Sequence, residues 1–223
     1  MNFLFAEHSI DWKLESKTGN HLIIENPYVI DCLVNALKNR VLKIDDKIVL
    51  YEDEPIDFNK SVQVCFSPVD LIFEKKEIQK KLFAEMKEAI ETTEISSQFI
   101  EAQTIFLETL QRLRVEMDYE IDVEEDLGIE FLLKAFNVHL KNPEGNFSQR
   151  LIEYIVDINR ILRKKVFIFV GCQAYIGIGD MQSIIEQLAY EEIYVLFIDG
   201  YQNFDLLEIG NHYIIDRDMC EIH

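Results

Sequence analysis

Acidic residues occupy every second position in the middle of this chain, from Glu116 to Glu124. In an extended segment alternate side chains share a face, so the acids would lie on one side and the apolar residues on the other. Crowded carboxylates repel one another, and their pKa values rise unless a cation lies among them. Carboxylates around one hard cation form a calcium or magnesium site. The stretch from Glu116 to Asp126 therefore predicts such a cation site or, alternatively, a solvated acidic loop or helix end.

The acidic stretch does not follow the EF-hand pattern. Asp118, Glu120 and Asp122 resemble its first three ligand positions. Val123 stands where that pattern requires glycine, however, and Glu130 comes one residue too late for the bidentate glutamate. A cation here would need a different, tertiary arrangement of ligands.

Composition restricts the class of protein. The chain has 223 residues, is 48% hydrophobic and carries a formal net charge of −19, which permits one large domain or two small ones. This charge opposes nucleic-acid binding unless the basic residues gather on one face. No apolar run approaches a membrane span, and the first residues lack a secretory pattern. Four scattered cysteines fit reduced thiols, so we expect a cytoplasmic protein with no disulfide framework or zinc site.

The pattern of residues predicts an α/β domain interrupted by helices. Alternating residues in 3–24 suggest a hairpin that turns near Lys17 and returns at 22–24, followed by a helix from Pro27 and strands at 48–51 and 62–66. Residues 74–137 favour three helices, two of them separated near residues 92–93. Residues 138–223 return to alternating helices and strands. We therefore assign 1–73 and 138–223 to one discontinuous domain and 74–137 to a helical domain.

Two apolar runs, 166–170 and 194–198, resemble buried strands joined by a helix that starts near Asp180. Such a unit requires a parallel crossover. A further strand is expected near residues 213–215, at the edge of the sheet.

The segment after the first buried strand, residues 171–180, contains glycines but no Lys, Ser or Thr. It therefore fails the phosphate-binding pattern GxxxxGK[ST] and favours a simple turn. Cys172 follows a strand end, where nucleophiles often lie, but no histidine is near it in sequence. A cryptic enzyme, either a degenerate ATPase or a thiol hydrolase, is one alternative function. An acidic scaffold that binds only protein partners is another.

Several segments, each weak alone, resemble one family in the same order along the chain. They are the acidic segment 120–126, the helical segment 129–136, the basic cluster and strand 163–169, the strand 194–199 and the C-terminal region 201–215. Together they resemble the small DNA-binding accessory protein of type II-A CRISPR systems that is required for spacer acquisition.

The resemblance implies a fold related to P-loop ATPases, without a working nucleotide site and with a helical insertion. It implies a non-catalytic homotetrameric ring whose basic lumen holds double-stranded DNA, preferably at ends, with bound Ca²⁺ supporting the ring. The implied partners are the CRISPR integrase pair and the effector nuclease. Carried onto this sequence, the calcium ligands are Glu120, Asp122, Glu125 and Asp126, with Glu124 as a further candidate. The resemblance does not identify the DNA-contacting residues. The candidates are Lys13, Lys17, Lys134 and Lys141, because they lie near the predicted hairpin and the acidic segment in the sequence.

Overall fold

The computed structural model describes residues 1–67, 71–73, 76–117, 119–120, 122, 128–203 and 209–222. The chain divides into two compact units. Unit 1 comprises residues 1–72 and 142–223, and unit 2 comprises residues 73–141. The boundaries predicted from the sequence were after residue 73 and before residue 138.

A six-stranded sheet forms the centre of unit 1. Its order is β5-β6-β7-β3-β8-β9, parallel except for the last pair. Every residue of the central strand β3 is buried, as expected for a strand covered on both faces. The strands are β3 (Gly19–Ile24), β5 (Val62–Cys65), β6 (Val166–Val170), β7 (Tyr194–Asp199), β8 (Asn211–Ile215) and β9 (Glu221–Ile222).

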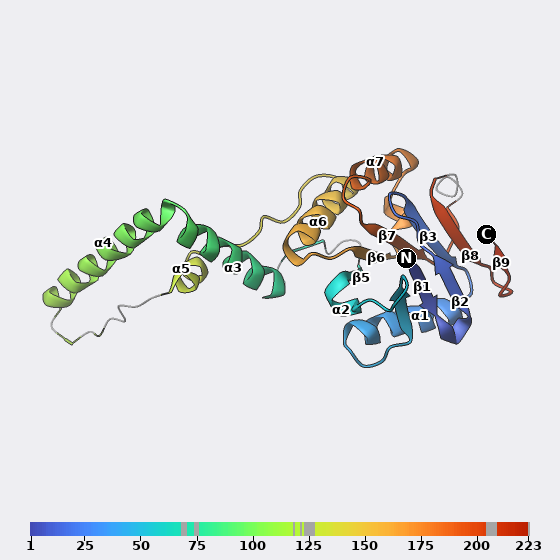
Figure 1. Cartoon of the computed structure of the whole chain (residues 1–223), viewed down its shortest axis with the longest axis horizontal. Coiled ribbons are helices and arrows are strands. Elements are labelled where there is room, and N and C mark those ends of the chain that lie inside the picture. The colour runs from blue at the N-terminus through green and yellow to red at the C-terminus, as the bar shows by residue number, and fades with distance from the viewer. Residues whose placement is uncertain are drawn as a thin grey trace. The chain divides into compact units, whose positions relative to one another are not determined.

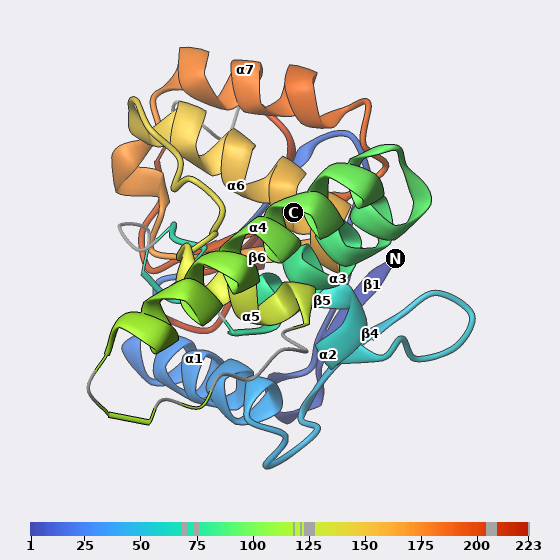
Figure 2. The same ribbon diagram turned by 90° about the vertical axis from the view of Figure 1, so that its left-hand side faces the viewer.

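Different layers cover the two faces of this sheet (Figure 1). Leu22 and Ile24 of β3 belong to a core shared with Phe3 of the N-terminal strands and Leu33 of helix α1 (Pro27–Val41). Strand residues alternate between faces, so His21 and Ile23 point the other way. Helices α6 (Phe147–Leu162) and α7 (Ile178–Leu188) cover that second face, and Figure 2 shows them side by side.

The predicted hairpin over residues 3–24 is wrong in its pairing. Strand β1 (Asn2–Phe5) pairs antiparallel with β2 (Ile10–Lys13) and with β4 (Ile48–Tyr51), forming a separate three-stranded sheet. A short 3-10 helix, η1 (Ala6–His8), connects β1 to β2. Residues 22–24 instead enter the parallel sheet, where an unbroken apolar run can be buried on both faces. The strand predicted near residue 213 likewise lies inside the sheet edge, because β9 pairs with β8.

Side-chain caps fix where the helices of unit 1 begin. The Asn26 side chain accepts hydrogen bonds from the backbone N–H groups of Tyr28 and Val29 at the start of α1. Asn146 and Gln149 form a capping box at α6. The helix predicted to start near Asp180, with Asp180 as its cap, starts at Ile178 instead, so Asp180 lies in the first turn of α7. The remaining helix, α2 (Phe58–Ser61), is capped by Asp57.

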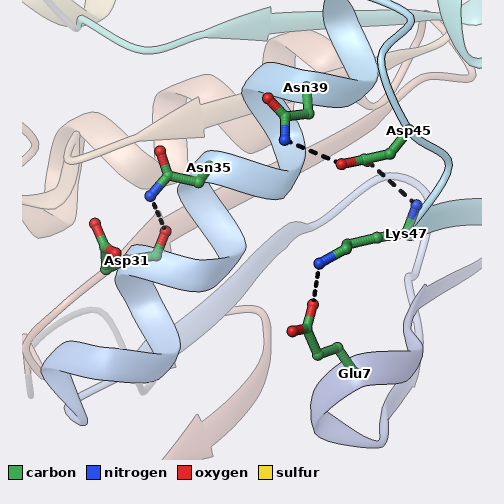
Figure 3. Close-up of polar contacts among 6 residues, drawn as sticks. All are labelled: Glu7, Asp31, Asn35, Asn39, Asp45 and Lys47. Atoms are coloured by element: carbon green, nitrogen blue, oxygen red, sulfur yellow. Dashed lines mark hydrogen bonds and ion pairs between the residues drawn. The ribbon is translucent and has the colours of Figure 1, made fainter.

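Polar contacts link the end of α1 to the loop that follows it, and that loop to η1 (Figure 3). The Asn39 amide donates to Asp45 Oδ2 at 3.0 Å, and the Lys47 backbone N–H donates to Asp45 Oδ1 at 3.4 Å. Lys47 Nζ lies 2.8 Å from Glu7 Oε2 in η1. Both partners are partly exposed, so this ion pair orients the segment more than it stabilises the fold.

Unit 2 consists of three helices, α3 (Lys76–Thr92), α4 (Ile95–Glu116) and α5 (Ile129–Ala135). Helix α3 packs against both α4 and α5. Ile78 and Phe83 of α3 and Leu133 of α5 are buried, whereas no residue of α4 is, over its fully described length. The predicted fold class, an α/β sheet domain with a helical insertion, is confirmed.

Candidate metal centre and nucleic-acid interface

The predicted calcium ligands lie in the connection between α4 and α5. The backbone becomes extended at Met117, directly after α4 ends. Glu120 and Asp122 follow it, and both are exposed. The other predicted ligands, Glu124, Glu125 and Asp126, lie outside the described residues.

Glu120 and Asp122 are suitable donors for a hard cation, because each offers carboxylate oxygens. Calcium takes six to eight oxygen ligands, so two exposed carboxylates alone do not complete a site. Over the described ranges no group of three or more His, Cys, Asp or Glu residues is arranged to hold a metal ion. Glu120 also lines an open surface cavity of about 310 Å³ with Arg114, Met117 and Tyr119. Of the predicted calcium ligands, only Glu120 and Asp122 lie among the described residues, and each would supply carboxylate oxygens to a calcium ion bound at this segment.

Two of the candidate DNA-contacting lysines belong to unit 1 and share one short segment. Lys13 ends β2, and Lys17 has a left-handed backbone with φ of 64° in the turn before β3. Both side chains are exposed. The structure therefore brings this pair onto one surface loop.

Two asparagines fix the backbone of this loop. The fully buried Asn20 accepts a hydrogen bond from the Glu15 N–H at 2.8 Å and donates to the carbonyls of Glu15 and Val195 at 2.9 and 3.0 Å. Asn211 of β8 donates to the Lys13 carbonyl at 2.9 Å and to Asn20 Oδ1 at 3.0 Å. The backbone beside Lys13 and Lys17 is thus held by the sheet beneath it.

The other two candidate lysines lie in unit 2. Lys134 lies in the last turn of α5, and Lys141 is the last residue of the unit. Both are exposed. In the basic cluster 163–165, by contrast, Lys164 is buried and donates to the Asn59 carbonyl. Its ammonium group is therefore directed to the protein interior, and only Arg163 and Lys165 of the cluster are exposed.

The turn from β3 into α1 is a place where an α/β fold could hold a phosphate, since a helix N-terminus attracts anions. Here Asn26 Oδ1 already accepts from two of the first N–H groups of α1, and Pro27 has no N–H to offer. The Glu25 N–H donates to the Ile215 carbonyl, and Asn26 Nδ2 donates to the Arg217 carbonyl. The groups that would bind a phosphate are occupied by the protein itself.

Cys172, the candidate nucleophile, is completely buried behind β6. Burial raises the pKa of its thiol, and the nearby Asp199 carboxyl raises it further. Because the thiolate is the nucleophilic form, this environment disfavours thiol catalysis.

The structure also groups three polar residues that sequence reasoning did not identify. His21 of β3, Gln173 of the short 3-10 helix η2 (Gln173–Tyr175) and Asp199 at the end of β7 are all buried, on the face that α6 and α7 cover. Their one signal in the sequence is a carboxylate directly after the apolar run 194–198. A buried carboxylate is unfavourable unless it is paired, hydrogen-bonded or neutral.

None of the helices in the described part of the chain combines the length and apolarity needed to cross a membrane.

Two comparisons with known proteins agree on one family. The family model for CRISPR-associated protein (Cas_Csn2) matches residues 42–219. CRISPR-associated protein Csn2 of Streptococcus agalactiae is 25% identical over 103 residues, which cover 46% of this chain and 45% of that protein. The chain thus matches less than half the length of this relative.

Solved structures support the fold. A crystal structure of Stu0660 of Streptococcus thermophilus matches with a TM-score of 0.64 at 12% identity, covering all of this chain and 76% of the other. At that identity the likeness concerns the fold alone. An ABC-transporter component, cbiO1 of Clostridium perfringens, matches at 14% identity and covers 96% of this chain and 80% of that one. Its TM-score of 0.47 is too low to support an argument. With the family model covering most of its length, the chain belongs to the Csn2 family of CRISPR-associated proteins, as the sequence motifs predict.

Proposed function

We propose that this protein is a non-catalytic, calcium-dependent protein that binds double-stranded DNA at its ends and acts in CRISPR spacer acquisition. In this proposal four copies form a ring and work beside the integrase pair and the effector nuclease. Family membership is the observation that carries the proposal. The CRISPR-associated role follows from the family, whereas the DNA, the calcium and the ring are what we propose for this chain.

Helix α4 supports self-association. It is 22 residues long and buries none of them within its own unit. Several of its large apolar side chains are exposed, and Ile95 at 53%, Phe106 at 55% and Leu113 at 44% share one face at helical spacing. An exposed apolar helix face of this length is a typical protein–protein interface. A second copy of the chain would cover it in the proposed ring.

Assembly also addresses the charge. A chain with a net charge of −19 repels DNA as a single copy. A ring concentrates the lysines of several copies around one duplex, while the acids bind cations or face solvent. Lys13 and Lys17 are suited to this role because their loop is exposed on a fixed backbone. Lys134 and Lys141 are the candidates from unit 2.

Calcium would bind the acidic stretch through Glu120, Asp122, Glu125 and Asp126, with Glu124 as a further ligand. Bound there, it would neutralise repulsion between the carboxylates. Magnesium offers similar chemistry but demands a tighter octahedral site and gives up its water reluctantly.

A gel-shift titration with linear duplex DNA tests the proposal. We expect a shift in calcium that disappears when a chelator is added, and an affinity that falls steeply with salt. Native mass measured in parallel should correspond to four copies in calcium. A single-copy mass under those conditions together with no shift would contradict the proposal.

Paired substitutions locate the two sites. Asp122→Ala with Glu125→Ala should abolish the calcium dependence, whereas Glu101→Ala with Glu108→Ala on exposed positions of α4 makes the same charge change and should leave it intact. Lys13→Ala with Lys17→Ala should weaken DNA binding and reduce its salt dependence. The matched control is Lys80→Ala with Lys81→Ala on α3. Equal losses in the test and control pairs would show that net charge, not a site, governs binding.

The same samples separate the alternatives. A cryptic ATPase or thiol hydrolase would turn over nucleotide or ester above blank, with activity removed by one substitution in 171–180. An acidic scaffold would bind no DNA at any calcium concentration. The self-capped start of α1 and the buried thiol of Cys172 support the non-catalytic proposal.

A further inference from the structure

Gln173 connects the loop after β6 to two neighbouring strands. Its backbone N–H donates to Asp199 Oδ1 of β7 at 3.2 Å, and its side-chain Nε2 lies 3.4 Å from His21 Nδ1 of β3. The His21 ring stacks on Phe197, with centroids 5.3 Å apart and planes at 16°. Asp199 is 2% exposed and Gln173 and His21 are each 1% exposed. These contacts fasten the segment 171–177, which links β6 to α7.

This polar cluster is incompletely satisfied. Asp199 Oδ2, Gln173 Oε1 and His21 Nε2 are all buried, and none has a hydrogen-bond partner among the described residues. Buried polar atoms without partners are rare in native proteins, and each one costs stability. A protonated Asp199 would become a hydrogen-bond donor. An ionised Asp199 would leave both oxygens as acceptors.

Among the residues that the structure describes, no cation compensates a charge on Asp199. The titratable groups around it are Cys172 from the loop after β6, Tyr201 after β7, and His21 on β3, with His212 of β8 facing His21. Over the described part of the chain, none of the ion pairs involves Asp199. An ionised carboxylate here would therefore be buried without a counter-charge, which is strongly unfavourable.

The segment 171–177 is only partly buried, and the Gly171 N–H donates to the Ile198 carbonyl at 2.9 Å where the segment leaves the sheet. Gly171 has a φ of +73°, so it turns the chain directly after β6. Gly171, Ala174, Tyr175 and Gly177 are exposed, and only Cys172, Gln173 and Ile176 are buried. Short exposed segments with few buried contacts are those that open locally in native proteins.

We propose that Asp199 is a pH-sensitive latch: its neutral carboxyl group keeps the segment 171–177, with Cys172 buried in it, packed against the sheet, and its ionisation lets that segment open. The proposal concerns a conformational device in unit 1 and is independent of the DNA and calcium sites.

The direction of the pH effect follows from the environment. Burial raises the pKa of Asp199 from 3.8 to about 7, and the Gln173 N–H offsets this only in part. In the opened segment the carboxyl group would regain its ordinary value. Closure is therefore most stable at low pH and weakens as pH rises through about 7. Burial, followed by the nearby His212, lowers the pKa of His21 to about 4, so His21 stays neutral near pH 7 and supplies no charge.

Hydrogen exchange of the whole chain, read by mass spectrometry, tests the latch. The exchange rate of the 171–177 peptide in the parent is divided by that in Asp199→Asn at the same pH, which removes the intrinsic pH dependence of exchange. We expect this ratio to rise on the order of tenfold or more between pH 5 and pH 8. Asp180→Asn, a half-exposed carboxylate in the next helix, is the matched control and should give a ratio independent of pH.

A second measurement uses the parent protein alone, so it remains available if Asp199→Asn fails to fold. In the parent alone, alkylation of Cys172 relative to the partly exposed Cys32 should rise with pH, with its midpoint near 7. A flat exchange ratio for Asp199→Asn, or a flat alkylation ratio in the parent, would overturn the proposal.

Discussion

The two units of this chain bury their apolar residues very differently. In unit 1 the aromatic and aliphatic residues of β1, β3, β6 and β7 are almost completely buried between two layers. In unit 2 only Phe73, Ile78, Phe83 and Leu133 are buried hydrophobic residues among those described. Its longest helix, α4, exposes large apolar side chains along its whole length. Unit 1 therefore contains its own core, whereas much of the apolar surface of unit 2 is not covered by the described residues of that unit.

This difference shows that an apolar residue can stabilise either the folding of its own unit or the association with a partner. Burial inside a unit stabilises folding, at roughly 25 cal/mol per Å² removed from water. An apolar residue that stays exposed contributes little until a partner covers it, and then it stabilises association. If α4 is an assembly surface, substitutions in the two units should affect different measurements.

The largest effect is expected in the sheet core. Phe169 of β6 is completely buried and stacks on Phe197 with centroids 5.9 Å apart. Phe169→Ala should lower the free energy of unfolding by about 3–5 kcal/mol, measured by urea denaturation at low protein concentration. The matched change Phe106→Ala on α4 should cost below about 1 kcal/mol in the same measurement. Equal costs would mean that unit 2 buries Phe106 by itself.

Association should show the reverse order. Phe106→Glu with Leu113→Glu places charges on the exposed face of α4, so it should weaken self-association by at least tenfold, equivalent to about 1.4 kcal/mol or more. The measurement is native mass over a dilution series. Leu42→Glu with Ile44→Glu, on exposed apolar residues of unit 1, is the control. Loss of assembly in the control alone would place the interface on unit 1.

Asp199 should give unit 1 a pH dependence. Its raised pKa means that its contribution to stability is complete below about pH 4 and disappears as pH rises through about 7. The lowered pKa of His21 acts oppositely, since its contribution is present above 6.5 and is lost as pH falls through about 4. Between these limits the two effects oppose each other in the parent protein.

Asp199→Asn removes one of these effects. The difference in unfolding free energy between Asp199→Asn and the parent should therefore shift in favour of the variant by about 2 kcal/mol between pH 4.5 and pH 7.5. Urea denaturation at several pH values measures it. A difference that stays constant over this range would mean that Asp199 ionises in the folded protein as it does in the unfolded chain.

The local patterns of the sequence were sufficient to predict most elements. The apolar runs 166–170 and 194–198 correspond to β6 and the greater part of β7, and Asn26-Pro27 gives the start of α1. These features depend on neighbours in the chain. The strand with which residues 22–24 pair cannot be predicted from chain neighbours, because a hairpin strand and a parallel strand require similar side chains. Residues 22–24 pair with β7 and β8, which are distant in the sequence and so are not represented in the local pattern.

The functional residues divide in the same way. The acidic stretch and the family were recognisable because their residues are contiguous or ordered along the chain. The cluster of His21, Gln173 and Asp199 was not, because only the sheet brings residues 152 and 26 positions apart into contact. The lysine candidates were chosen by position in the sequence, and the structure supplies the reason that Lys13 and Lys17 share a fixed loop.

The smallest expected effect compares helix starts in the two units. Asn146 caps α6 with a reciprocal hydrogen-bond pair to Gln149, whereas Glu94 precedes α4 with no side-chain cap. Asn146→Ala should therefore lower the unfolding free energy by about 1 kcal/mol. Glu94→Ala should change it by less than about 0.5 kcal/mol, because it removes no hydrogen bond to the helix. Thermal unfolding of both variants at one pH measures the contrast. If Glu94→Ala lowers the unfolding free energy as much as Asn146→Ala does, Glu94 stabilises the N-terminus of α4, and the helix does not depend only on a partner that packs on its exposed face.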